Sequence, residues 1–105
     1  MPREMTRASY RGDVKEVLRR YGPFAPIEGA EGIDRYLFIS TELGKTAFLR
    51  VSVSQGEGDT KRLFIQCEGD EAERVTGAMR EFFEYTGLQT EEIPKDEREM
   101  LEQFY

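Results

Sequence analysis

The sequence predicts a single α+β domain over residues 1–105, and three observations support this class. Two segments, one on each side of a central region, carry apolar residues at helical spacing. Between them lie three apolar segments joined by short turns, which is typical of a three-stranded antiparallel meander. The length of 105 residues suits one domain. The predicted order is α-β-β-β-α-(α), with the helices packed on the aliphatic face of the sheet.

The first predicted element is a helix. Its apolar stripe consists of Tyr10, Val14, Val17, Leu18 and Tyr21. Its N-cap is Ser9 or Thr6, and residues 1–8 are considered as a flexible N-terminus. Alternatively, Asp13 and Glu16 form a capping box and the helix begins later.

The first helix is expected to end at Gly22 and Pro23, because glycine commonly follows a helix and proline cannot continue one. The next ten residues, 23–32, contain two prolines and two glycines. This composition predicts a loop.

Three strands follow, and their alternation sorts the side chains onto two faces. Residues 36–39 are continuously apolar, while residues 46–54 and 62–67 alternate. We expect Ser40 to pair with Thr46, and Ser54 with Thr60. The aliphatic face then consists of Leu37, Ile39, Ala47, Leu49, Val51, Val53, Leu63, Ile65 and Cys67. This face is predicted to form the core with both helices.

The second helix is predicted to begin at Asp70, with Glu73 completing a capping box. Its buried stripe consists of Val75, Met79, Phe82 and either Phe83 or Tyr85. Gly87 is the expected C′ residue and Leu88 its hydrophobic C″ partner. Residues 89–105 are predicted to form a linker and a C-terminal helix that starts at Pro94.

The second face of the sheet carries the candidate binding residues, which are Tyr36, Phe38, Phe48, Arg50, Arg62 and Phe64. An exposed aromatic patch of this kind is typical of an interaction surface. Three coverings are considered: the last helix with Met100, Leu101 and Phe104, a second copy or another protein, or single-stranded nucleic acid.

The charge of the chain is −6 but is unevenly distributed. Residues 1–22 contain six basic and three acidic residues, whereas residues 91–105 contain two basic and six acidic residues. Basic residues recur every four positions at Arg3, Arg7, Arg11, Lys15 and Arg19. On a helix they would form a stripe, either for an anionic partner or as a solvated face.

The composition offers no candidate for catalysis. The chain has no histidine and a single cysteine, Cys67, which is predicted to point into the core. No spacing predicts a metal or cofactor site. No apolar run reaches the ~20 residues of a membrane helix, and one unpaired cysteine fits a cytoplasmic protein.

We therefore expect a non-enzymatic protein–protein interaction module of an adaptor, chaperone-like or regulatory kind. It is expected to form a homodimer or to bind another protein through the aromatic face or the last helix. One alternative is a nucleic-acid-binding domain that uses the same face and the N-terminal basic residues. Another is an acidic inhibitor whose C-terminal carboxylates mimic nucleic acid.

Overall fold

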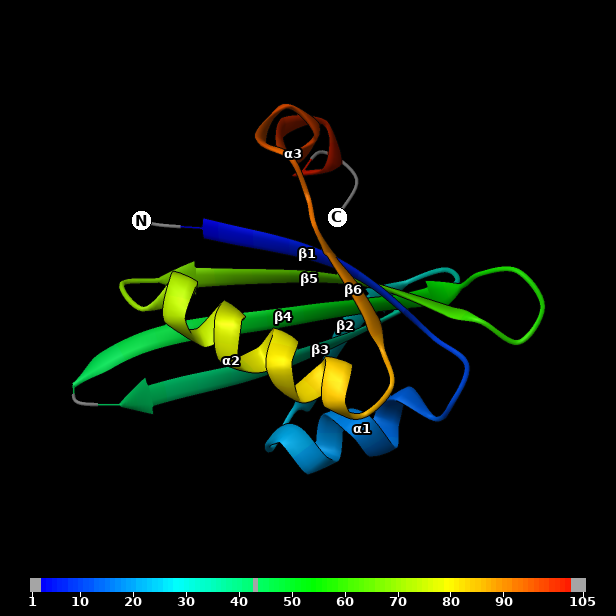
Figure 1. Cartoon of the computed structure of the whole chain (residues 1–105), viewed down its shortest axis with the longest axis horizontal. Coiled ribbons are helices and arrows are strands. Elements are labelled where there is room, and N and C mark those ends of the chain that lie inside the picture. Colours follow the sequence, from blue (N-terminus) through cyan, green and yellow to red (C-terminus); the bar gives the residue numbers. More distant parts are fainter. Residues whose placement is uncertain (1–2, 43, 103–105) are drawn as a thin grey trace.

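A computed structural model of the chain describes residues 3–42 and 44–102. Its elements are β1 (Arg3–Tyr10), α1 (Val14–Tyr21), β2 (Ala25–Ala30), β3 (Ile33–Glu42), β4 (Lys45–Gln55), β5 (Lys61–Gly69), α2 (Ala72–Tyr85), β6 (Gln89–Glu92) and α3 (Lys95–Glu102). The strands form one antiparallel sheet in the order β2-β3-β4-β5-β1-β6 (Figure 1). The predicted α+β class is confirmed, but the predicted element order lacked three strands.

The predicted meander is present as β3, β4 and β5, and β2 extends it by one strand. Residues 23–32 were predicted to form a loop, yet residues 25–30 pair with β3. All residues of β2 are exposed, and Pro26 is tolerated because an edge strand needs hydrogen bonds on one side only. An irregularity in the pairing between Ile27 and Ala30 also interrupts this edge.

The N-terminal segment is a strand and not the start of a helix. β1 lies between β5 and β6 and pairs antiparallel with both. Its sequence is largely polar, so its own pattern is weak, and the two flanking strands provide the pairing that makes it regular. The predicted basic stripe therefore does not form, because Arg3 and Arg7 lie on β1 whereas Lys15 and Arg19 lie on α1.

Helix α1 follows the later of the two predicted starts. The Asp13 carboxylate accepts hydrogen bonds from the backbone N–H groups of Lys15 (3.1 Å) and Glu16 (3.4 Å). At the other end, the Gly22 N–H donates to the Leu18 carbonyl, so the helix stops at the predicted glycine. Asp13 is therefore the N-cap, and the alternatives at Ser9 and Thr6 are wrong.

Helix α2 differs from the prediction at its start and matches it at its end. It is capped at Glu71, without a side-chain cap, so the capping box from Asp70 to Glu73 does not form. After its last turn, the Leu88 N–H donates to the Phe83 carbonyl (2.9 Å) and the Gly87 N–H to the Glu84 carbonyl (3.1 Å). These two bonds and the positive φ of Gly87 (103°) define a Schellman motif, as predicted.

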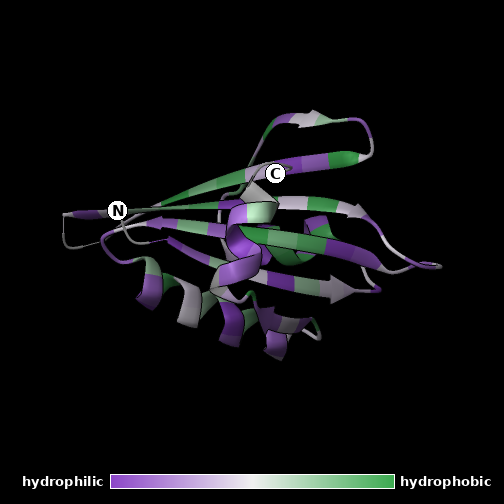
Figure 2. Cartoon of the chain, turned by 90° about the horizontal axis from the view of Figure 1, so that it is seen from above, coloured by the Kyte–Doolittle hydropathy of each residue, from purple (hydrophilic) through white to green (hydrophobic). Residues whose placement is uncertain are grey.

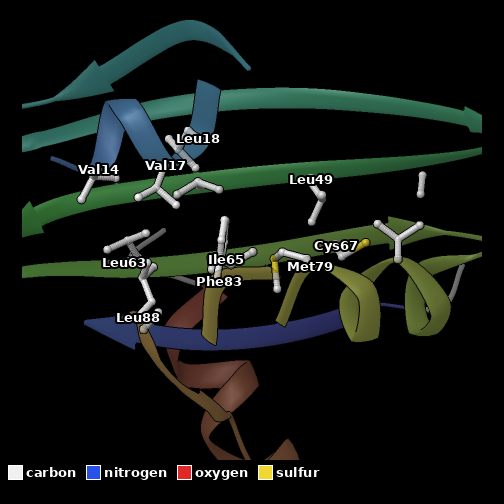
Figure 3. Packing of buried hydrophobic residues seen from close by; sticks show 14 of the residues in the cluster. Val14, Val17, Leu18, Leu49, Leu63, Ile65, Cys67, Met79, Phe83 and Leu88 are labelled. Atoms are coloured by element: carbon white, nitrogen blue, oxygen red, sulfur yellow. The ribbon is translucent and has the colours of Figure 1, made fainter. Parts of the chain in front are cut away.

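Both α1 and α2 pack on one face of the sheet, which we call the helix face (Figure 1). Figure 3 shows the core there, with Leu18 of α1 and Phe83 of α2 directed toward Leu49 and Ile65 of the sheet. The Tyr21 ring lies 5.4 Å from the Phe82 ring and 5.8 Å from that of Phe83. The predicted packing of two helices on an aliphatic face is therefore present.

The register of β3 on β4 differs from the prediction by one residue. Ser40 pairs with Ala47 and not with Thr46, because only two residues, 43 and 44, separate the paired ends of the strands. A one-residue shift moves every side chain of a strand to the other face. The β4–β5 register differs by two residues, with Ser54 opposite Arg62, and so leaves the faces unchanged.

None of the helices described in residues 3–42 and 44–102 is long and apolar enough to cross a membrane.

Candidate functional site

The face of the sheet opposite α1 and α2 is the candidate site, and we call it the open face. Its side chains, placed by the register of the strands, are Ile27, Ile33, Arg35, Leu37, Ile39, Thr41, Thr46, Phe48, Arg50, Ser52, Ser54, Arg62, Phe64, Gln66, Glu68, Arg3, Met5, Arg7, Ser9, Gln89 and Glu91. It contains five arginines and two glutamates, although the chain as a whole is acidic.

The structure brings together four of the six residues predicted for binding. Phe48, Arg50, Arg62 and Phe64 share the open face. Tyr36 and Phe38 do not belong to it, because the register of β3 turns them toward the helices. The Phe38 ring packs against those of Tyr21 (5.7 Å) and Phe24 (5.4 Å). The predicted patch of four aromatic residues is therefore wrong, and half of it belongs to the core.

Leu37 and Ile39 take the places predicted for the two aromatic residues. Leu37 lies opposite Arg50, and Ile39 lies opposite Phe48. A signal for this arrangement exists in the sequence, because Gly44 suits the second position of a two-residue hairpin loop. With a two-residue loop at positions 43 and 44, Ile39 lies opposite Phe48.

Helix α3 covers the β1 end of the open face in part. It runs across the strand direction and is largely hydrophilic (Figure 2). Beside it, Met5, Phe64 and Ile93 form a second, small buried cluster. Ile93, which precedes α3, packs on Phe64 in this cluster, whereas Met100 of the predicted lid remains 64% exposed. The side chain of Leu101 and all of Phe104 lie outside the described residues.

Polar contacts hold α3 in this position. The Arg98 guanidinium donates to the backbone carbonyls of Ile93 (3.1 Å) and Arg3 (3.4 Å). It also ion-pairs with Glu4 (3.5 Å) and Glu92 (3.3 Å). On the sheet side, the Glu97 carboxylate lies 2.6 Å from the Arg7 guanidinium. These contacts hold α3 beside the first residues of β1, which extend beyond the end of β6.

The rest of the open face carries exposed apolar side chains. The exposed large hydrophobic residues in the described part of the chain are Ile27, Ile39, Phe48, Tyr85 and Met100, and all but Tyr85 border this face. Ile39 is 52% exposed and Phe48 is 39% exposed. They are cross-strand neighbours, so their exposed areas are contiguous.

Two of the hollows on the open face are lined by a phenylalanine of the predicted site, Phe64 or Phe48. The larger, of about 440 Å³, lies between α3 and the sheet and is lined by Arg7, Ser54, Arg62, Leu63, Phe64, Glu97 and Met100. The smaller, of about 150 Å³, is lined by Leu37, Phe48, Arg50, Gln66 and Glu68. Both combine apolar side chains with arginine.

The smaller hollow is lined by a polar pair, Arg50 and Gln66. The Arg50 guanidinium donates to the Gln66 side-chain carbonyl from Nε (2.9 Å) and from a terminal nitrogen (2.5 Å). On the next cross-strand pair, Arg35 Nε and Ser52 Oγ are buried and have no hydrogen-bond partner within residues 3–42 and 44–102. Leaving such atoms unpaired costs free energy. In the described chain, this cost falls on Arg35 and Ser52.

The structure gives no support to a catalytic thiol at Cys67. The residue is buried on the helix face and is 1% exposed. Burial raises the pKa of its thiol, which keeps the unreactive protonated form at neutral pH. Among the side chains that the structure describes, no group of three or more carboxylates and cysteines is placed to hold a metal ion.

The sequence matches no protein-family model, and no curated protein is significantly similar to it. The case for a function therefore depends on the geometry of the open face.

Proposed function

We propose that this protein is a non-enzymatic protein–protein interaction module that binds a protein partner through the open face. The observation that supports this best is the gathering of exposed apolar side chains on one face, where Ile39 and Phe48 are cross-strand neighbours toward the β3–β4 hairpin. Water disfavours exposed apolar area, and a contiguous patch of this kind typically marks a binding surface.

The composition of the open face favours a protein over single-stranded nucleic acid. Nucleic-acid platforms on sheets stack successive bases on several exposed rings. Among the residues placed on the open face, Phe48 is the exposed aromatic residue, since Phe64 is buried with Met5 and Ile93. Its other apolar side chains are aliphatic, as at Ile27, Leu37 and Ile39. Aliphatic side chains bordered by arginine are suited to a protein surface.

An affinity-capture experiment tests this function. The wild-type protein, Ile39→Ser, Phe48→Ser and a control, Tyr85→Ser, are used to capture partners from extract of the cells that make the protein. Tyr85 is a suitable control because it is 86% exposed but lies on α2 and not on the open face. We expect the same proteins with the wild type and Tyr85→Ser, and their loss with both open-face variants.

Two results would contradict this proposal. One is capture that is unaffected by the Ile39 and Phe48 substitutions. The other is loss of capture that follows unfolding, which circular dichroism of each variant detects. Light scattering on the same variants identifies a second copy as the partner if the wild type self-associates and Ile39→Ser does not. Binding of an oligonucleotide that depends on Phe48, without protein capture, would replace the proposal by the nucleic-acid alternative.

A further inference from the structure

Two unpaired polar atoms on the open face point to a binding site for an anion. We propose that Arg35 and Ser52 together bind an oxyanion, which is a phosphate or carboxylate group carried by a ligand. This site goes beyond the proposed function, because it needs no protein partner and is tested with the purified protein alone.

The first observation is that both atoms are buried without a partner. Ser52 lies on the open face, yet it is only 3% exposed. Its Oγ and the Nε of Arg35 are buried, and neither has a hydrogen-bond partner within residues 3–42 and 44–102. The two residues are cross-strand partners on β3 and β4, so their Cβ atoms lie about 4.5–5.5 Å apart. Both unpaired atoms therefore belong to one place on the face.

The chemistry of these two atoms selects an anion. The Nε of arginine always carries a hydrogen and only donates, and the serine hydroxyl also has a hydrogen to donate. A negatively charged oxygen accepts hydrogen bonds from both groups, and such charge-assisted bonds are stronger than neutral ones. A cation would be repelled by the guanidinium and would leave its N–H without an acceptor. The pair of Arg35 and Ser52 is therefore suited to an oxyanion and not to a metal ion.

The surrounding open-face side chains do not oppose an anion. Those of β3 and β4 are Ile33, Arg35, Leu37, Ile39, Thr41, Thr46, Phe48, Arg50, Ser52 and Ser54. Neither strand, both of which are described over their whole length, contributes a carboxylate to this face. The Arg50 guanidinium is bonded to Gln66 and is not counted as a ligand, but its charge and that of the exposed Arg62 make the local potential more positive.

The Arg35 side chain gives access to the buried hydroxyl. It is partly exposed, and within the described residues its one hydrogen bond is a long one, from a terminal nitrogen to the Glu28 carbonyl (3.5 Å). Glu28 lies on the exposed edge strand β2, so this bond directs the guanidinium toward solvent at the edge of the sheet. Rotation of an arginine side chain is fast and breaks only this contact. The guanidinium can then hold the anion over Ser52.

Titration of the full-length protein with inorganic phosphate, followed by NMR of the backbone amides, tests this site. A parallel titration with acetate distinguishes a phosphate from a carboxylate as the group that binds, and sodium chloride keeps the ionic strength constant. The variants are Ser52→Ala and Arg35→Gln. Their matched controls are Ser54→Ala, which changes a neighbouring serine on the same face, and Arg20→Gln, which changes an exposed arginine on α1.

We expect saturable shifts of the amides at positions 35 and 52 with at least one of the two anions, in the wild type and in both controls. We expect Ser52→Ala and Arg35→Gln each to weaken this binding by about tenfold or more, because each removes a charge-assisted hydrogen bond. Absence of saturable shifts with both anions, or equal binding by the variants and their controls, would overturn the inference.

Urea unfolding in a buffer without either anion gives a second readout, and a cooperative transition also shows that each variant folds. Because the Ser52 hydroxyl has no partner in the described structure, we expect Ser52→Ala to keep or raise the midpoint. A midpoint below that of Ser54→Ala would show that Arg35 or another group of the protein pairs with this hydroxyl, and would contradict the site. Protein capture through Ile39 and Phe48 is a separate measurement, so either result stands without the other.

Discussion

The side chains of Phe38 and Phe48 provide a direct test of the sheet register, from which the open face follows. Phe38 lies on the helix face and Phe48 on the open face, because Ser40 pairs with Ala47. In the register expected from sequence, with Ser40 opposite Thr46, the two rings would be cross-strand neighbours on one face. Substituting each residue by alanine therefore distinguishes the two arrangements by their effect on the free energy of unfolding.

The structure gives different magnitudes for the two substitutions. Phe38 is partly buried and its ring contacts those of Tyr21 and Phe24. Removing a fully buried phenylalanine costs ~3–5 kcal/mol, and each aromatic pair contributes ~0.5–1.5 kcal/mol, so Phe38→Ala is expected to cost about 2–3 kcal/mol. Phe48 is 39% exposed, and Phe48→Ala is expected to cost about 1 kcal/mol or less.

The assay is urea-induced unfolding of both variants and the wild type, followed by circular dichroism. Unchanged m-values are needed for the comparison, because they show that the same surface is exposed on unfolding. A lower midpoint for Phe38→Ala than for Phe48→Ala supports the register. Equal losses, or a larger loss for Phe48→Ala, would refute the assignment of these rings to opposite faces and with it the composition of the open face.

Three further predictions concern the rest of the fold. Gly87→Ala is expected to lower the free energy of unfolding by about 1–2 kcal/mol, because φ at this position is 103°; an unchanged urea midpoint would contradict the Schellman motif. Cys67 is expected to react with a thiol reagent at least about 100-fold more slowly in the native than in the urea-unfolded protein, since burial hides it and raises its pKa; comparable rates would contradict its burial. The hydrogen bond and ion pair with Lys45 (3.0 Å) lower the pKa of Glu71, and the hydrogen bond with Arg74 is the next largest cause. Because the pKa is lowered in the folded protein, the Glu71 carboxylate stabilises the fold at pH values above the ordinary carboxyl pKa. This stabilisation is lost as the pH falls through the lowered value. The stability difference between wild type and Glu71→Gln is therefore expected to shrink on acidification, and a difference that grows would be inconsistent with the lowered pKa.

Local sequence patterns predicted the elements whose structure is determined by their own residues. The apolar stripes located α1 and α2, and Gly87 with Leu88 located the end of α2. Strong local capping and periodic burial are properties of the segment itself, so they can be read without knowledge of its neighbours.

The remaining strands depend on tertiary pairing and were not predicted. β1 is polar and becomes regular between β5 and β6, while β2 carries Pro26 at an exposed edge. Neither has a periodicity of its own that separates it from a loop. Such strands are determined by their partners.

Half of the candidate site was predicted correctly, because the length of the loop between two strands decides which of their side chains share a face. Phe48, Arg50, Arg62 and Phe64 lie where β4 and β5 alternate, and a register error of two residues left them together. Tyr36 and Phe38 were assigned to the wrong face because the expected pairing of Ser40 with Thr46 requires a loop with an odd number of residues, whereas the loop that contains Gly44 has two. The last helix was one of three coverings considered, and the pairs that position α3, such as Glu97 with Arg7, are long-range contacts that no local pattern specifies.

Photo-crosslinking inside cells tests the central claim, that the open face binds a protein, most directly. A photoreactive amino acid is placed at position 39 in one variant and at position 85 in another, since both side chains are exposed but on different surfaces. We expect covalent adducts with a protein from position 39 and none from position 85. Absence of adducts from position 39, or the same adducts from both positions, would contradict it.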